Sequence, residues 1–359
     1  MIADRIDPHT LPPWNGWRAG DPSYDGAVTL TLHRLPVPAS MVDRGIDDLL
    51  VYRVPLTVRF RRIDVRDGLL LHGPSGWGET SPFWDYDAAE SSAWLRAGIE
   101  GATSSLPDPL RDSIPVNVTV PVVDPGQAYR IVSSSGCATA KVKVADPRSR
   151  LSADCARVEA VRDALGAGGR IRIDANAAWT VDEAVAAITE LAAAAGELEY
   201  AEQPCPSIAD LAAVRRRVDV PIAADESVRR AEDPLAVARA GAADLIIVKA
   251  QPLGGVLRAL QVVEEAGLPA VVSSALDTSV GIGLAAHLAA AMPRLDHACG
   301  LATTRLFTGD VTPDPLLPQN GSIPVRRVTV DTSGVTEGGR ELCGRWAARL
   351  DEMAEALDD

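Results

Sequence analysis

From residue 116 onward, short apolar runs rich in β-branched residues alternate with alanine-rich segments of helical periodicity. The eight strands that this pattern predicts are Val116–Val123, Thr139–Val144, Arg170–Ala175, Leu198–Gln203, Pro221–Glu226, Leu245–Ala250, Ala270–Leu276 and Ala298–Ala302. The helices predicted between them include Val181–Ala195, Leu235–Ala240, Val256–Glu265 and Ile282–Ala291. Alternation of this kind predicts an α/β barrel of the (β/α)₈ type, and the nearly continuous apolar strands suit a parallel sheet that is buried on both faces.

The residues before this barrel follow a different pattern, which predicts a smaller α+β unit. Strands are expected at Leu49–Val54 and Leu69–Leu71, and a helix is expected at Ala88–Glu100. Between the two strands, residues 54–62 are short and basic, with arginines at positions 59, 61 and 62. We expect this segment to be a loop that closes over the mouth of the barrel, where one of its arginines meets a substrate carboxylate.

Both ends of the chain lie outside these two units. Residues 1–40 contain many prolines, so a poorly ordered extension is expected there, with Met41 as an alternative start. Near the other end, Ile323–Val330 and Arg340–Leu357 are expected to pack outside the barrel. The predicted division is an extension at 1–40, a capping domain at 41–113, a barrel at 114–308 and a C-terminal segment at 309–359 that packs on cap and barrel.

The amino-acid composition excludes some classes of partner and compartment. The 359 residues carry a net charge of −14 and have a sequence pI of about 4.9. Nucleic acids and anionic membrane surfaces do not attract an acidic protein, so we expect neither as a partner. The five cysteines are scattered, odd in number and without metal-ligand spacing, which favours reduced thiols. With no apolar run of transmembrane length and no secretory signal, a cytoplasmic protein is expected.

The first candidate functional residues are two lysines on one predicted strand. In Lys141-Val142-Lys143, strand alternation points both ammonium groups to the same face. Two cations on one face of an apolar strand are costly to bury unless anions face them. Alone, this pattern is typical of a solvated edge strand, but the strands that follow supply the anions.

Three successive strands each end in a carboxylate, at Asp174, Glu202 and Asp225, and the next strand ends in Lys249. Each acid alone is weak evidence, because a strand-end acid such as Asp174 often caps the next helix. In a barrel, however, these strand ends meet at the face where catalysis takes place. Three carboxylates with open positions suit Mg²⁺, and lysines on both sides suggest proton abstraction next to a metal-bound carboxylate.

In order along the chain, these motifs resemble those of the enolase superfamily, muconate-lactonising-enzyme subgroup. The motifs are Lys141-Val142-Lys143, Asp174-Ala175-Asn176, Glu202-Gln203-Pro204, Asp225-Glu226-Ser227 and Lys249. The resemblance covers about residues 45 to 310 and implies a (β/α)₇β barrel, an α+β cap and one Mg²⁺, which Mn²⁺ can replace. It implies that the metal ligands are Asp174, Glu202 and Asp225, that the acid/base lysines are Lys143 and Lys249 with Lys141 beside them, and that Asn176, Gln203 and Glu226 lie behind the ligands.

Within this subgroup, the chain resembles the o-succinylbenzoate synthases. The likeness lies in residues 49–53, 66–70 and 76–83, in Gly254-Gly255 and in residues 273–281. The glycines would allow a close backbone approach, and a helix that begins near Val280 would offer free N–H groups to a carboxylate. The residues expected to contact substrate are therefore Gly254, Gly255, Ser273, Ser274 and Ala275.

The implied reaction is the syn-dehydration of 2-succinyl-6-hydroxy-2,4-cyclohexadiene-1-carboxylate to 2-succinylbenzoate, a step of menaquinone biosynthesis. In it, Lys143 removes the proton next to the ring carboxylate, and then protonates the departing hydroxyl on the same face. Lys249 stabilises the anionic intermediate from the opposite face. The expected partner is a small dicarboxylate substrate, and the sequence does not indicate the oligomeric state.

Other reactions use the same lysines and carboxylates. Racemisation of N-acylamino acids, N-succinylamino acids included, uses both lysines as bases, and both are present. Dipeptide epimerases often carry Asp-x-Asp on the last strand, where this chain has Cys299–Thr303, and mandelate-racemase chemistry needs a histidine where Ser273-Ser274 stands. His287 and His297 are interpreted as structural. A non-catalytic binding barrel would be expected to lack a ligand or a lysine, and none is missing.

Overall fold

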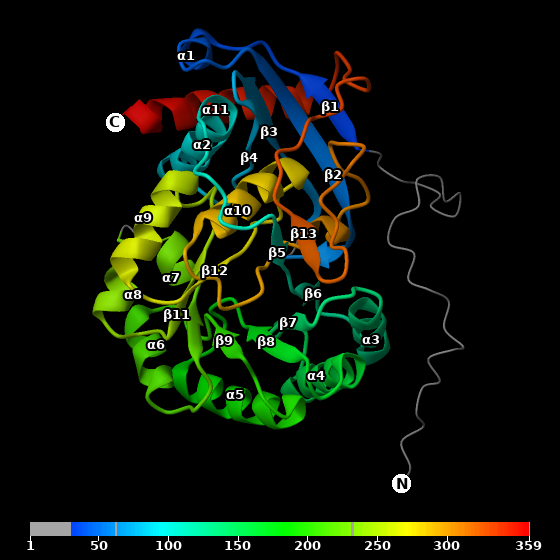
Figure 1. The fold of residues 1–359 in the computed structure, drawn as a ribbon, viewed down its shortest axis with the longest axis vertical. Helices are drawn as coiled ribbons and strands as arrows, with labels where there is room; N and C mark the ends of the chain where they lie inside the picture. Colours follow the sequence, from blue (N-terminus) through cyan, green and yellow to red (C-terminus); the bar gives the residue numbers. More distant parts are fainter. Residues whose placement is uncertain (1–29, 62, 231–232, 359) are drawn as a thin grey trace.

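The computed structural model describes residues 30–61, 63–230 and 233–358 (Figure 1). Within them, the largest sheet has seven parallel strands in the order β12-β11-β10-β9-β8-β7-β6. These strands are β6 (Val118–Val120), β7 (Thr139–Lys143), β8 (Arg170–Asp174), β9 (Tyr200–Glu202), β10 (Ile222–Ala224), β11 (Leu245–Val248) and β12 (Ala270–Val272). Each strand lies inside a predicted run, which confirms the α/β barrel pattern.

The eighth predicted strand, Ala298–Ala302, forms single bridges instead of a ladder. Cys299 pairs with Val116 on one side, and Gly300 pairs with Ser273 on the other. The ladder cannot extend further, because Pro115 has no N–H and the 3₁₀ helix η1 begins at Thr303. These bridges close the curled sheet into a (β/α)₇β barrel.

Helices surround the barrel, as the alanine-rich segments predicted. They are α3 (Pro125–Ser133), α4 (Leu151–Leu165), α5 (Val181–Ala195), α6 (Ile208–Arg215), α7 (Glu226–Arg229), α8 (Ala236–Arg239), α9 (Val256–Ala266) and α10 (Ser279–Ala291). Helix α5 has the predicted bounds, because Thr180 and Glu183 form a capping box at its first turn. No helix in the described parts of the chain is long and apolar enough to cross a membrane.

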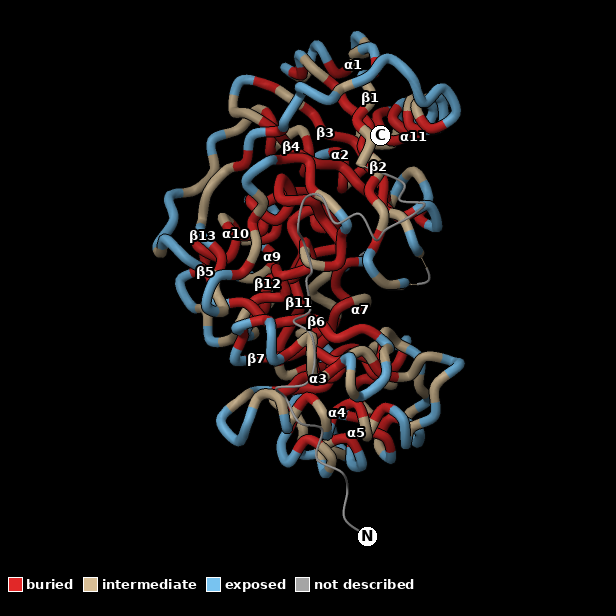
Figure 2. Tube along the Cα trace, turned by 90° about the vertical axis from the view of Figure 1, so that its right-hand side faces the viewer, coloured by how far each residue is buried: buried red, intermediate tan, exposed pale blue. Residues whose placement is uncertain are grey.

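The barrel strands are largely buried, and Figure 2 shows these elements mostly in the buried colour. Inside the barrel, a small cluster fills the space below the strand ends and comprises Tyr200, Ala223, Leu245, Ile247 and Val271. The opposite strand faces pack against the surrounding helices within the main core. Burial on both faces explains the continuous apolar runs of β10 to β12. Strands β7 and β8 instead alternate polar and apolar residues.

The residues before the barrel form an antiparallel sheet in the order β1-β2-β3-β4 with helices against it. Its elements are β1 (Thr31–Arg34), α1 (Ala39–Val42), β2 (Asp48–Phe60), β3 (Ile63–Gly73), β4 (Gly76–Thr80) and α2 (Ala88–Thr103). The long helix α11 (Arg340–Asp358) packs on α2, and β5 (Ser113–Pro115) pairs with β13 (Ser322–Pro324) (Figure 1). The proposed domain boundaries stay a prediction.

Two expectations about this region are corrected. Residues 1–29 of the predicted extension lie outside the described residues, but residues 31–40 are not poorly ordered, because β1 pairs with β2 and Leu32 and Leu35 are buried. The predicted loop at residues 54–62 is largely strand. Strand β2 runs through Phe60, which pairs with Ile63 after an irregularity that begins at Pro55.

Candidate active site

The carboxyl ends of neighbouring barrel strands bring together the charged side chains that the sequence singled out. Lys141 and Lys143 lie on β7, Asp174 on β8 and Glu202 on β9, whereas Asp225 directly follows β10 and Lys249 directly follows β11. The parallel register places Lys143 beside Asp174 and Asp174 beside Glu202. All but Glu202 line one cavity of about 30 Å³.

Each of the three predicted metal ligands has a lysine partner. The ammonium of Lys141 donates to both oxygens of Glu202 at 2.9 and 3.0 Å and lies 3.1 Å from Asp174. Lys143 donates to Asp174 at 2.5 Å. The carboxylate side chains of Asp174 and Glu202 are each only 1% exposed, so these pairs are shielded from solvent.

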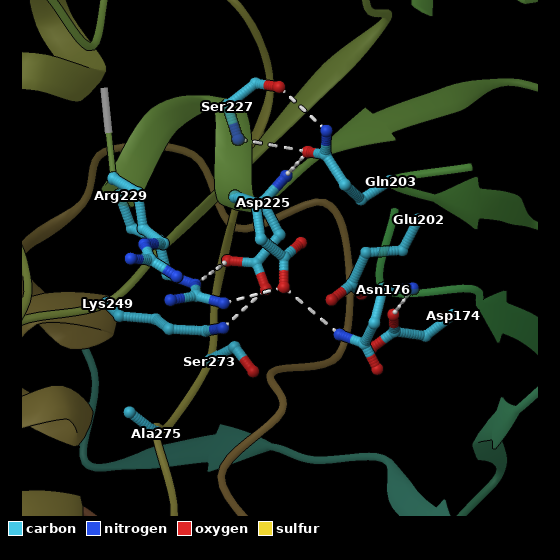
Figure 3. A network of polar contacts seen from close by, with 12 residues as sticks. Asp174, Asn176, Glu202, Gln203, Asp225, Ser227, Arg229, Lys249, Ser273 and Ala275 are labelled. Carbon is cyan, nitrogen blue, oxygen red and sulfur yellow. Dashed lines mark hydrogen bonds and ion pairs between the residues drawn. The ribbon is translucent and has the colours of Figure 1, made fainter. Parts of the chain in front are cut away.

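On the far side, two cations converge on Asp225 (Figure 3). Lys249 donates to Oδ2 of Asp225 at 2.6 Å, and the guanidinium of Arg229 donates to Oδ1 at 3.0 Å. Arg229 also donates to Glu226 at 2.6 Å and to the hydroxyl of Tyr86, which comes from the segment between β4 and α2. The arginine therefore connects this carboxylate to the residues that precede the barrel.

Burial and ion pairing shift the pKa values of these groups in opposite directions. Burial alone would raise the pKa of Asp174, but the charges of Lys143 and Lys141 outweigh it and hold that pKa well below its usual range. Burial and the negative charge of Asp174 raise the pKa of Glu202 to about 7. Burial lowers the pKa of Lys143, and it lowers the pKa of Lys249 to about 8. The site thus favours additional positive charge near Glu202.

The three residues predicted behind the carboxylates hold them and the lysines in place. The side-chain oxygen of Asn176 accepts from Lys143 at 2.7 Å, and its amide donates to Glu226 at 3.2 Å. Gln203 accepts from the backbone N–H groups of Asp225 at 2.9 Å and Ser227 at 3.1 Å. These contacts fix the backbone from which Asp225 projects.

Of the predicted substrate contacts, the structure brings only the group that follows β12 to this cavity. Ser273, Ser274 and Ala275 line it. Gly254 and Gly255 do not line it. A Cβ on Gly255 would collide with the carboxylate of Glu100 on α2, so this glycine, with φ of +121°, accommodates that side chain. Its contact with substrate stays a prediction.

The expectation of free N–H groups at the start of α10 is wrong. The carboxylate of Glu79, on β4, accepts from the N–H groups of Thr278 at 3.1 Å and Gly281 at 3.0 Å. Asp310 accepts from the N–H of Ser279 at 3.2 Å. Protein carboxylates thus occupy the positions that the sequence assigned to a substrate carboxylate.

The hairpin between β2 and β3 forms the remaining wall. Phe60 and Arg61 both line the cavity, and the ammonium of Lys143 lies 5.3 Å from the centre of the Phe60 ring. The hairpin therefore reaches the site, as expected of residues 54–62. The ring of His287 bonds to the carbonyl of Gly283, and His297 contacts Glu199, so neither histidine lines this cavity.

Comparison with known proteins identifies the family. The model for the enolase C-terminal domain-like family matches residues 126–330, and the enolase N-terminal domain-like model matches residues 51–102. The o-succinylbenzoate synthase of Thermobifida fusca is 56% identical over 299 residues, which is 83% of this chain and 93% of that protein. The o-succinylbenzoate synthase of Mycobacterium leprae is 50% identical over 80% of this chain and 84% of that protein. The chain belongs to the o-succinylbenzoate synthases.

Solved structures support the fold. A muconate lactonizing enzyme from Pseudomonas fluorescens, complexed with muconolactone, has a TM-score of 0.67 at 21% identity and covers 84% of this chain and 99% of that one. A dipeptide epimerase from Enterococcus faecalis has a TM-score of 0.65 at 23% identity and covers 80% of this chain and 98% of that one. These enolase-superfamily structures share the architecture of this member of the o-succinylbenzoate synthase family.

Enolase-superfamily enzymes generally use Mg²⁺, and the donor chemistry of this site fits the ion. Asp174, Glu202 and Asp225 supply only oxygen donors, as Mg²⁺ prefers, and the raised pKa of Glu202 shows a need for positive charge. Among the described residues, no three acidic, histidine or cysteine side chains already converge as a metal site. Lys141 and Lys249 donate to the oxygens of Glu202 and Asp225, and each carboxylate keeps further lone pairs that can hold a cation.

Sequence reasoning missed two groups in this member of the family. Arg229 stands four residues after Asp225 on the short helix α7, and this i,i+4 spacing is the signal that could have found it. Glu79 had no such signal, since its partners Thr278 and Gly281 lie about 200 residues away in the chain.

Proposed function

We propose that this chain catalyses the Mg²⁺-dependent syn-dehydration of 2-succinyl-6-hydroxy-2,4-cyclohexadiene-1-carboxylate to 2-succinylbenzoate, a lyase step of menaquinone biosynthesis. Its identity to o-succinylbenzoate synthases supports the substrate. The observation that carries the mechanism is the arrangement of lysines, with Lys143 on β7 and Lys249 after β11 on either side of three buried carboxylates.

Lys143 acts as the acid and base. Its neutral amine removes the proton next to the ring carboxylate, and the resulting ammonium protonates the hydroxyl that leaves from the same face, so one group serves both steps. Asn176, which accepts from Lys143 at 2.7 Å, holds the amine in its orientation. Loss of the hydroxyl makes the ring aromatic, which favours the elimination.

Lys249 stabilises the negative charge that develops on the ring. Its side chain is 6% exposed and its ammonium is held at 2.6 Å from Asp225, so it presents a fixed charge in a site that excludes water. Asp174, Glu202 and Asp225 would hold one Mg²⁺ or Mn²⁺ ion. When bound, the ion would supply positive charge next to the substrate carboxylate.

We infer further that the protein acts in the cytoplasm. The five cysteines all lie in the described residues and are unpaired, which suits a reducing compartment.

A direct assay tests the proposed reaction. Purified protein with Mg²⁺ should convert the cyclohexadiene to 2-succinylbenzoate, followed as loss of diene absorbance, and a chelator should stop the conversion. Excess Mg²⁺ added after the chelator should restore it. Folded, Mg²⁺-loaded protein that leaves the diene unchanged would refute the proposal.

Racemisation of N-succinylamino acids is the second candidate. It requires a base on each side of the α-carbon, and the placement of Lys143 and Lys249 on separate strands favours it. The two reactions are distinguishable, because racemisation exchanges the α-proton with D₂O without forming an aromatic ring.

A further inference from the structure

Arg61 is a cation in the cavity wall, and no carboxylate of the described residues forms a hydrogen bond with it. Lys141, Lys143 and Lys249 each have a carboxylate oxygen within 3.1 Å. For Arg61, the acidic partner in the described part of the chain is Glu226, at 3.9 Å, which is beyond hydrogen-bond distance. Glu226 is itself held by Arg229 at 2.6 Å. The guanidinium of Arg61 therefore has donors free for an anionic ligand.

Arg61 stands at the boundary between an inner and an outer cavity. The inner cavity, of about 30 Å³, contains the carboxylates and the lysines, and a more open cavity of about 450 Å³ lies outside it. Phe60, Arg61, Lys143 and Asn176 line both. A ligand whose ring lies against Lys143 would therefore extend its chain past Arg61.

The guanidinium of Arg61 is turned inward and is partly held in place. It lies 4.6 Å from the centre of the Phe83 ring, a cation–π distance, and its side chain is 25% exposed although it stands at a hairpin tip. The backbone of Arg61 is left-handed, with φ of +48°, which is typical of a tight turn. A planar guanidinium restrained in this way loses little freedom when it binds a carboxylate through two hydrogen bonds.

We propose that Arg61 binds the second carboxylate of the substrate, at the end of the succinyl chain. This inference rests on the proposed function, which places the ring carboxylate at Asp174, Glu202 and Asp225. The distal carboxylate then needs a separate cation, and Arg61, whose acidic partner Glu226 is 3.9 Å away, lies at the exit of the inner cavity.

The opposite wall offers no charge for this purpose among its described residues. The hydroxyls of Ser274 and Thr303 bond to each other at 2.6 Å, and Ser273 donates weakly to the carbonyl of Gly300 at 3.5 Å. Neutral hydroxyls can orient a ligand, but they discriminate less strongly between a carboxylate and an uncharged group than an arginine does.

The test compares two ligands that differ only at the distal end. 2-Succinylbenzoate has both carboxylates, whereas 2-butyrylbenzoate keeps the ring carboxylate and the ketone and has a methyl group in place of the distal carboxylate. Their Kd values are measured by calorimetry in Mg²⁺ for the wild type, Arg61→Met, Arg61→Lys and Arg59→Met. Arg59→Met is the matched control, because Arg59 lies on the same hairpin and lines the outer cavity but not the inner one, with its side chain 54% exposed.

Arg61→Met should weaken the binding of the diacid by roughly 10- to 100-fold and change that of the monoacid by less than about 3-fold. Arg61→Lys should retain part of the affinity, and Arg59→Met should change neither ligand. In turnover, Arg61→Met should raise KM for the cyclohexadiene with kcat within a few-fold of wild type.

Three outcomes would overturn the assignment of Arg61 while the wild type still converts the cyclohexadiene. They are unchanged diacid affinity in Arg61→Met, an equal loss for both ligands, and an equal loss in Arg59→Met. A wild-type protein that neither converts the cyclohexadiene nor binds the diacid would instead refute the proposed function, and this inference with it.

Discussion

Replacing Glu79 by glutamine tests how the residues before the barrel stabilise the β12 side of the site. The carboxylate of Glu79 is fully buried. It accepts from the hydroxyls of Tyr52 at 2.8 Å and Ser81 at 2.9 Å, and from the hydroxyl of Thr278 at 2.6 Å. It also accepts the N–H groups of Thr278 and Gly281 in the first turn of α10. Gly281 makes this approach feasible, since a Cβ there would lie 2.9 Å from a Glu79 oxygen.

The size of the effect follows from these contacts. In Glu79→Gln, an NH₂ group replaces one of the two carboxylate oxygens. The N–H groups of Thr278 and Gly281 keep an oxygen acceptor only if this NH₂ group points to Tyr52 and Ser81, whose hydroxyls can rotate to accept from it. All five bonds to the Glu79 side chain then become neutral. The two from backbone N–H groups account for about 1 kcal/mol each, and the favourable interaction of a charge with the helix terminus, about 1 kcal/mol, is lost. We expect the free energy of unfolding to fall by about 3 kcal/mol.

The assay is thermal unfolding followed by circular dichroism. A loss of this size should lower Tm by roughly 4 °C. Glu197→Gln makes the same chemical change at an exposed position and should leave Tm unchanged. Since α10 follows the residues that line the cavity, KM for the cyclohexadiene should also rise in Glu79→Gln. Equal Tm values for Glu79→Gln and wild type would refute the reasoning.

Three further predictions concern the site and its pH dependence. Lys143→Ala should reduce kcat to the background of the diene assay, at least about 10³-fold, in protein with an unchanged circular dichroism spectrum; near-wild-type turnover would exclude its role as the base. Asp225→Asn should weaken Mg²⁺ binding in calorimetry by roughly 10-fold or more and lower turnover with it, whereas unchanged Mg²⁺ affinity would remove it from the ligands. Burial alone would raise the pKa of Glu199, but hydrogen bonds from His297 and Arg172 outweigh it and lower that pKa to about 2. Ionised Glu199 therefore stabilises the fold above its ordinary pKa of 4.5, and this contribution should disappear as the pH falls from about 4.5 towards 2. Glu199→Gln should flatten this part of the Tm–pH curve, and an identical curve would show that the contribution is absent.

The sequence predicted the barrel and the charged group at its mouth for a simple physical reason. Alternation puts Lys141 and Lys143 on one face of a strand, and parallel register then puts Asp174 and Glu202 beside them. Both features depend on local spacing, which the sequence displays directly. Whether these residues bind a metal and move a proton stays a prediction.

Contacts between segments that lie far apart in the sequence could not be predicted from local spacing. The start of α10 was expected to bind a substrate carboxylate, because only the tertiary fold brings Glu79 to its N–H groups. Likewise, only the fold places Gly255 against Glu100 of α2. At the start of α10, the local motif indicated a site for an anion correctly, but the anion belongs to the protein.

We expect this site to dehydrate a cyclohexadiene carboxylate in preference to racemising an amino acid. The measurement is the ratio of two kcat/KM values for the Mg²⁺-loaded wild type: conversion of the cyclohexadiene to 2-succinylbenzoate, and α-proton exchange of an N-succinylamino acid in D₂O. We predict that dehydration is faster by at least about 10-fold, and that both reactions are lost in Lys143→Ala. Rapid α-proton exchange without formation of 2-succinylbenzoate would contradict the account.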